Sequence, residues 1–272
     1  MGFSLYMVWY TLFMKWPSGD VGYEDFLMRL TPDNNLFWLY ILGIAVNAGM
    51  GFAVYIIPTI NSLREHAGPI PHWLHCLYCA GDFMGIWVFL QAWIDTHFWF
   101  FLMFCVAEAV WTGLEIWFIH GAFTWERDIV FPADSTFKEN LANTLIMIFA
   151  FFVALNILRV YLHDFTMWKF WLFTNILITV APPLYLQKRK TRIGGARCWY
   201  IILVCICFDS YLPVISMWHF MAPQFFAPSE NIWIYLVFPV VLWAAIRGLR
   251  LYNRLPEKPA IIDRTGKPPI FK

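Results

Sequence analysis

Long apolar segments alternate with short polar ones along most of this 272-residue chain. Each apolar segment approaches the roughly 20 residues that an α-helix needs to cross the hydrocarbon core of a bilayer. A backbone without water satisfies its hydrogen bonds internally, so such segments are expected to be helices. The pattern predicts seven transmembrane helices, at residues 36–60, 73–93, 98–120, 141–162, 165–186, 198–218 and 232–251.

The predicted fold class is therefore all-α, a polytopic membrane protein with a single seven-helix bundle in residues 1–255. Residues 1–35 are expected to form a lumenal, interfacial segment that begins with a helix, because no basic residue precedes its apolar stretch and no small-residue cleavage site follows. Residues 256–272, rich in proline and charge, predict a loosely ordered cytosolic tail.

Composition supports lipid as the solvent. Apolar residues make up 60% of the chain and charged residues 14%, against about 25% charged in a typical soluble domain. The net charge of +1 and the absence of a basic run with interleaved aromatics exclude nucleic acid as an expected partner. All six cysteines fall inside apolar segments, which predicts buried free thiols.

Basic residues indicate the orientation. Five of them fill residues 188–197, and four more follow at 247–258, whereas residues 219–231 contain none. Positive charge favours the cytosolic side. We expect the C-terminus to be cytosolic and the N-terminus lumenal.

Four carboxylates fall within the predicted spans: Asp82, Glu108, Glu115 and Asp209. A charged side chain at mid-membrane costs roughly 2.5–3.5 kcal/mol, so each acid is a candidate functional residue. Glu108 and Glu115 are seven residues apart and lie nearly in line on one helix face. Desolvation disfavours the charged form, so some of these acids are expected to be protonated and able to donate a proton. The alternative is that they pair with Arg159, His120 or indole N–H groups and only fix helix packing.

Aromatic and polar side chains near the acids are candidate substrate-binding residues, since aromatic faces stabilise cations. These candidates are Tyr78, Trp87, Trp111, Thr112, Trp117 and His120.

A second alternative is a metal site. His72, His75, Cys76, Cys79 and Asp82 recur at three- and four-residue spacing and could share one helix face. No other span adds a matching cluster, so no metal is predicted. The chain also lacks a phosphate-binding glycine loop, a nucleophile elbow, an HExxH motif and the aspartate-rich motif of diphosphate-ionising terpene synthases.

Three stretches carry a resemblance to a known family: YIIPTINSLREHAGPIPHWLHCLYCAGDFMGIW, WTGLEIWFIHGAFTWERD and LQKRKTRIGGARCWYIIL. They resemble the integral-membrane terpene cyclases of fungal meroterpenoid and indole-diterpene biosynthesis, the group that includes the paspaline and pyripyropene cyclases. Asp82 falls where the family usually has a catalytic glutamate, and Glu115 where members often carry a polar or acidic residue. The third stretch resembles the family's basic loop. The last span, IWIYLVFPVVLWAAIRGLRLY, lacks the aspartate expected there.

The resemblance implies an isomerase- or lyase-type cyclase in the endoplasmic reticulum membrane. Its substrate would be an epoxidised prenylated aromatic made by a partner monooxygenase, as in the ascochlorin and ascofuranone branch. A protonated carboxyl would open the terminal epoxide, and a base would remove the final proton, with no metal or organic cofactor. Asp82 and Glu115 are the expected principal acid and base, with Glu108 and Asp209 as supporting proton carriers. The alternative from another class is a seven-span transporter or receptor that uses the same acids to bind a small organic molecule.

Overall fold

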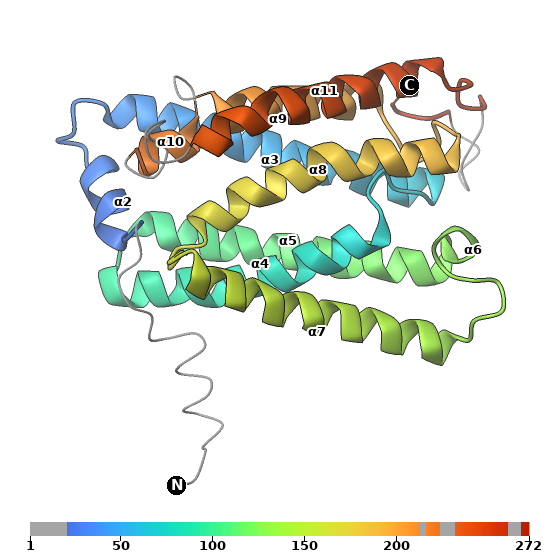
Figure 1. Ribbon diagram of the computed structural model, residues 1–272, viewed down its shortest axis with the longest axis horizontal. Coiled ribbons are helices and arrows are strands. Elements are labelled where there is room, and N and C mark those ends of the chain that lie inside the picture. The colour runs from blue at the N-terminus through green and yellow to red at the C-terminus, as the bar shows by residue number, and fades with distance from the viewer. Residues whose placement is uncertain (1–20, 213–215, 224–231, 261–267, 272) are drawn as a thin grey trace, which may run out of the picture.

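The computed structural model describes residues 21–212, 216–223, 232–260 and 268–271, and all regular structure in these ranges is helical (Figure 1). The predicted all-α class is confirmed for these residues. The predicted N-terminal interfacial helix lies in residues 1–20, outside the described ranges. The helices are α2 (Tyr23–Arg29), α3 (Phe37–Glu65), α4 (His72–Thr96), α5 (Trp99–Thr124), α6 (Arg127–Val130), α7 (Phe137–Tyr161), α8 (Trp168–Arg189), α9 (Arg197–Tyr211), α10 (Met217–Met221) and α11 (Ile232–Arg254).

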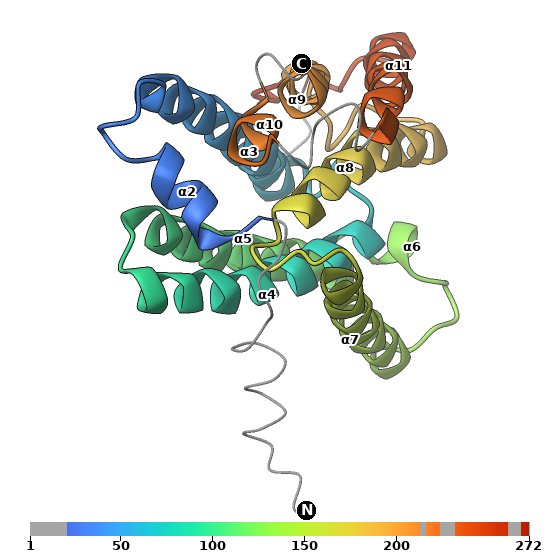
Figure 2. The ribbon, with the colours of Figure 1, turned by 60° about the vertical axis from the view of Figure 1, so that its left-hand side comes forward.

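The long helices run side by side along the long axis of the molecule (Figures 1 and 2). Helix α4 packs against α5 and α7 on one side of the bundle. On the other side α11 packs against α8 and α9, and α9 also contacts α3. The short helices α2 and α6 lie at opposite ends of the bundle (Figure 1).

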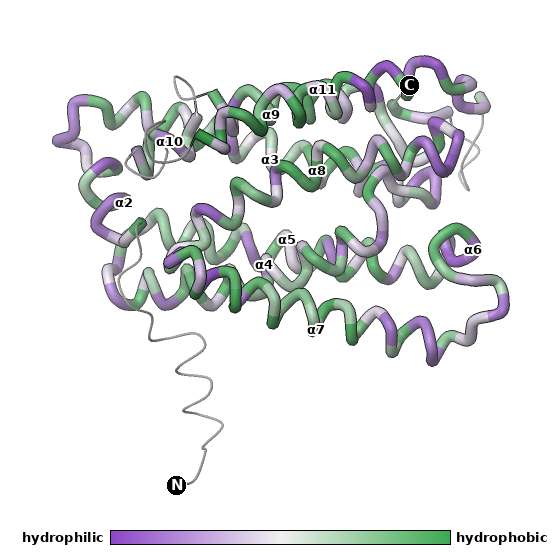
Figure 3. Tube along the Cα trace, viewed as in Figure 1, coloured by the Kyte–Doolittle hydropathy of each residue, from purple (hydrophilic) through white to green (hydrophobic). Residues whose placement is uncertain are grey.

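Hydropathy is arranged in a band across the bundle. Hydrophilic residues gather at both ends and hydrophobic residues fill the middle of the long helices (Figure 3). Six helices, α3, α4, α5, α7, α8 and α11, are long and apolar enough to cross a membrane. Large apolar side chains on their outer faces are exposed, for example Phe149 at 68% and Ile146 at 65%. Such a surface is favourable in lipid and not in water, so the chain is a multi-pass membrane protein.

The predicted count of seven spans is not confirmed, because the span expected at 198–218 is divided. Helix α9 has 15 residues, which at about 1.5 Å per residue is shorter than a hydrocarbon core of about 30 Å. Its C-cap Leu212 is extended, with ψ 117°, and Pro213 follows it in the sequence. A residue before proline disfavours the helical conformation, which explains why α9 ends there.

Hydrogen bonds tie the basic connection between α8 and α9 to the end of the bundle that carries α6. Arg192 donates from Nε to the carbonyl of Tyr252 at 2.9 Å. The amide of Gly194 donates to Glu65 Oε2 at 2.7 Å, and Glu65 Oε1 receives Lys258 Nζ at 2.7 Å. Burial lowers the pKa of the Lys258 ammonium, and the hydrogen bond to Glu65 opposes that shift. The tail is therefore anchored at Lys258, where a loosely ordered segment was predicted.

Candidate functional site

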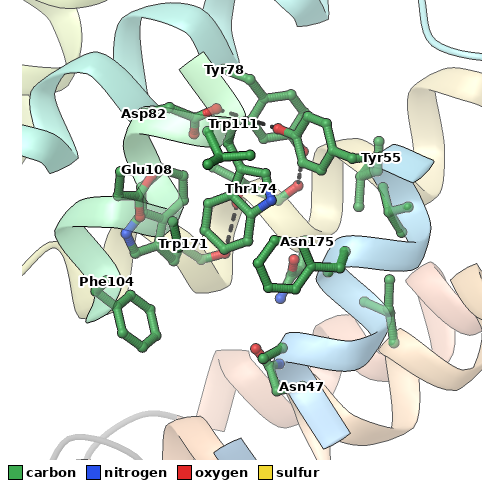
Figure 4. Close-up of a pocket in the computed structure, with 18 of the residues that line it drawn as sticks. Asn47, Tyr55, Tyr78, Asp82, Phe104, Glu108, Trp111, Trp171, Thr174 and Asn175 are labelled. Atoms are coloured by element: carbon green, nitrogen blue, oxygen red, sulfur yellow. Dashed lines mark hydrogen bonds between the residues drawn. The ribbon is translucent and has the colours of Figure 1, made fainter. Parts of the chain in front are cut away.

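A cavity of about 340 Å³ lies inside the bundle, between α3, α4, α5, α8 and α9, with Trp218 of α10 against it (Figure 4). This volume is at the lower end of the range of small-molecule sites. Most of its wall is apolar or aromatic, and no Lys, Arg or His of the described residues lines it. The polar residues that line it are Asn47, Tyr55, Tyr78, Asp82, Glu108, Thr174 and Asn175.

Asp82 reaches the cavity from α4 and is 1% exposed. The hydroxyl of Tyr55, on α3, donates to Asp82 Oδ2 at 3.3 Å. The neighbouring Tyr78 donates instead to the carbonyl of Thr174 at 2.9 Å, which holds its ring as part of the wall. Asp82 thus accepts one hydrogen bond, from the phenol of Tyr55. The ring of Tyr78 lies beside it on the same wall of the cavity (Figure 4).

Glu108 reaches the same cavity from α5 and is also 1% exposed. Neither of its carboxyl oxygens has a hydrogen-bond partner among the described residues. The side chain packs against Gly85, one turn after Asp82 on α4, where an added Cβ would lie 2.9 Å from Glu108 Cδ. The absent side chain of Gly85 therefore makes room for the Glu108 carboxyl beside Asp82.

The other two predicted acids lie behind the cavity wall. Glu115 is 0% exposed, and its Oε2 is 2.6 Å from His75 Nδ1. Asp209, on α9, accepts a hydrogen bond from Asn47 Nδ2 at 2.6 Å. Neither acid lines the cavity. The structure thus brings Asp82 and Glu108 together at the cavity. Glu115 and Asp209 do not line it, and they contact His75 and the cavity-lining Asn47 respectively.

Of the predicted substrate-binding residues, Tyr78 and Trp111 line the cavity. Trp111 stacks on Tyr55, with ring centroids 6.0 Å apart. Thr112 faces inward but donates to the backbone carbonyl of Glu108 at 2.8 Å.

Three further candidates lie elsewhere, because they occupy other helix faces. At about 100° per residue, Trp117 lies some 180° around α5 from Glu108, and His120 some 120°. These two rings pack on each other and on Trp125. Trp87 lies about 140° around α4 from Asp82 and packs on Phe83 instead.

The cavity reaches the outer face of the bundle between α3 and α5. Four of its apolar lining residues are also exposed on the outside: Phe52 (36%), Met103 (39%), Val106 (57%) and Val110 (49%). All four lie within helices that are apolar enough to span a membrane. The opening therefore faces the acyl chains of a bilayer rather than water.

The two histidines of the candidate metal-binding stripe on α4 contact different helices. His72 Nε2 is 3.1 Å from Thr144 Oγ1 on α7, whereas His75 contacts Glu115 on α5. The described residues contain no group of three His, Cys, Asp or Glu side chains placed to hold a metal ion. Arg159 is one of the partners that the packing alternative offers for the buried acids. It donates to the carbonyl of Phe165 at 3.1 Å, between α7 and α8.

Sequence reasoning missed several residues of the cavity, namely Asn47, Tyr55, Gly85 and Asn175. One signal was available: Gly81 and Gly85 are four residues apart on α4, a spacing of small residues that lets membrane helices approach closely. An added Cβ at Gly81 would lie 3.0 Å from the Phe170 ring of α8. The two asparagines and the tyrosine carried no comparable signal, because isolated polar residues recur throughout the spans.

Comparison with protein-family models, with curated proteins and with solved structures finds no match to this chain.

Proposed function

We propose that this protein is a membrane-bound cyclase that uses two neighbouring carboxyl groups to protonate and then deprotonate an apolar substrate. The observation that carries this proposal is Glu108, a buried carboxyl that faces an aromatic cavity beside Asp82 and has no hydrogen-bond partner among the described residues. An uncompensated charge is costly in such surroundings, so Glu108 is expected to be protonated. Asp82 receives the Tyr55 hydroxyl, and a donor of this kind favours the ionised form of a carboxyl group.

These environments assign different roles to the two acids in the proposal. Glu108 donates its proton to the oxygen of a substrate epoxide, and the bond from that oxygen to carbon breaks as a hydroxyl forms. The π electrons of a neighbouring alkene then form the new carbon–carbon bond and move the positive charge along the chain. Asp82 takes the proton that the final cation releases. Substrate and product are isomers, and transfer of one proton from Asp82 to Glu108 restores the starting state.

The aromatic wall supports cation chemistry at this place. Trp111, Trp171 and Phe104 line the cavity around the acids (Figure 4), and ring faces attract positive charge. The lateral opening between α3 and α5 suits a lipid-soluble substrate. The earlier expectation of Glu115 as a principal acid or base is replaced by Glu108, because Glu115 contacts His75 outside the cavity.

The resemblance in the α3–α4, α5 and α8–α9 regions supports an epoxidised prenylated aromatic as the substrate, a monooxygenase as the enzyme that supplies it, and the endoplasmic reticulum as the location. The basic residues at 188–197 and 247–258 lie in the last turns of α8 and α11 and just beyond them, and the C-terminal ends of these two helices lie at the same end of the bundle (Figure 1). By the positive-inside rule, that end is proposed to be cytosolic and the N-terminus lumenal.

The test is mass spectrometry of detergent-purified protein incubated, without added cofactor, with an epoxyfarnesyl phenol. We expect a product of unchanged mass and new retention time, reduced at least 100-fold in Asp82→Asn and in Glu108→Gln. Glu24→Gln, which alters an exposed acid on α2, is the matched control and should retain activity.

Recovery of unchanged substrate from a series of epoxidised prenyl aromatics would contradict the proposal. Saturable uptake of the same compounds into proteoliposomes would then favour the transporter, and binding without uptake would favour the receptor.

A further inference from the structure

The cavity has a second polar region, which the proposed acid chemistry does not use. Asn47 of α3 and Asn175 of α8 line the cavity on the side away from Asp82 (Figure 4). Both asparagines are only partly buried, because their amides border the empty space of the cavity. Aromatic and aliphatic side chains make up most of the remaining wall.

Each amide nitrogen of this second region already donates one hydrogen bond. Asn47 Nδ2 donates to Asp209 Oδ2 at 2.6 Å, and Asn175 Nδ2 donates to Ser210 Oγ at 2.8 Å. Asp209 and Ser210 are consecutive residues of α9 and are 4% and 1% exposed. A carboxylate accepts hydrogen bonds but does not donate them, so Asp209 fixes which end of the Asn47 amide turns away from it.

The amide oxygens and the second N–H of each amide are the groups left for a ligand. An amide oxygen accepts and an N–H donates, so this region suits a neutral group that can do both, such as a hydroxyl. It disfavours carboxylates and phosphates, since no cationic side chain of the described residues lines the cavity. Tyr55, whose hydroxyl contacts Asp82, follows Asn47 by eight residues on the same helix, or about 12 Å along its axis.

We propose that Asn47 and Asn175 form a head-group subsite that binds a hydroxyl of the substrate. This inference rests on the proposed function for the identity of the reacting end. It adds that the substrate carries a neutral hydrogen-bond donor at the opposite end of an apolar chain. Asp209 acts here as a positioning residue, because it touches Asn47 and not the cavity.

The test is equilibrium binding of two probes that have no epoxide, a farnesylated phenol and its methyl ether. Binding is followed by quenching of tryptophan fluorescence, since Trp111, Trp171 and Trp218 line the cavity. A neutral hydrogen bond contributes about 0.5–1.5 kcal/mol, which corresponds to roughly a 2- to 12-fold change in Kd. We expect the phenol to bind roughly 2- to 12-fold more tightly than the ether.

Variants separate the subsite from the rest of the cavity. Asn175→Leu should reduce the preference for the phenol to less than 2-fold, and Asn47→Leu should do the same. If Asn47→Leu fails to fold because Asp209 loses its partner, Asn175→Leu alone decides the question. Asn156→Leu on α7, whose amide donates to its own helix at the Phe152 carbonyl, is the matched control and should keep the preference.

Equal binding of phenol and ether by the unaltered protein would overturn the subsite, and so would a preference that persists in Asn175→Leu. These outcomes are independent of turnover. A protein that binds the phenol selectively but never converts an epoxide would disprove the cyclase and retain the subsite. Asp82→Asn should abolish product without changing the ratio of the two binding constants.

Discussion

Replacement of Glu108 by methionine is expected to stabilise the protein while it abolishes activity. Within the part of the chain that the structure describes, both carboxyl oxygens of Glu108 are buried without a hydrogen-bond partner, and leaving a buried polar group unsatisfied costs about 1–3 kcal/mol. Methionine has a similar length and no strong polar group, so it fills the same space without that penalty. A variant that is more stable and inactive would indicate that Glu108 is kept for chemistry rather than for folding.

The magnitude follows from the size of the chain. For domains of 150–250 residues, 1 kcal/mol shifts Tm by about 2–4 °C. Recovery of about 1–3 kcal/mol therefore predicts a rise in Tm of roughly 2–12 °C for Glu108→Met. The assay is thermal unfolding of the purified protein in one detergent, followed by tryptophan fluorescence.

Glu115 provides the matched comparison, seven residues away on the same helix. Its Oε2 is 2.6 Å from His75 Nδ1, and its Oε1 has no hydrogen-bond partner among the described residues. Glu115→Met removes that unsatisfied oxygen but leaves a buried imidazole nitrogen without its partner, so we expect Tm to fall. A Tm that falls equally in both variants would refute the reasoning, because it would mean that Glu108 is stabilised by a partner.

Two further predictions concern positions outside the acid pair itself. Gly85→Ala should lower kcat about 10-fold with little effect on KM, because its Cβ would displace the carboxyl of Glu108. Gly113→Ala is the control, since its added Cβ would meet no atom within 4 Å. Equal activity of the two variants would exclude the steric effect. Lys258→Met should lower the free energy of unfolding by about 3–5 kcal/mol, since it strips a buried Glu65 of its cation. The double variant with Glu65→Gln should recover much of this loss in denaturant titrations. A Lys258→Met variant as stable as the parent would contradict a stabilising role for the Lys258–Glu65 ion pair.

The candidate site shows how much of its geometry the spacing of residues along one helix can predict. The seven-residue interval between Glu108 and Glu115 correctly puts both on the inward face of α5, where each is buried. That face is long, and the cavity covers only part of it, so one acid borders the cavity and the other contacts α4. Which part is covered depends on α3 and α8, and no pattern within α5 reports their positions.

The sequence by itself determined the solvent and the class of fold. Long apolar segments favour helices because a helix satisfies its own backbone hydrogen bonds in lipid, so six of the long helices could be located from the hydropathy pattern along the chain. Local chemistry also decided some boundaries, such as the end of α9 before Pro213.

The tertiary structure alone decided which buried polar groups meet. Three hydrogen bonds join residues that are far apart in the sequence. Tyr55 and Asp82 are 27 residues apart, Asn47 and Asp209 are 162 apart, and Glu65 and Lys258 are 193 apart. Between membrane helices, where apolar surfaces are as well solvated by lipid as by each other, pairing depends on close contacts of small and polar side chains. Those contacts are set by the relative rotation and depth of whole helices, which is why the acid pair became visible only in three dimensions.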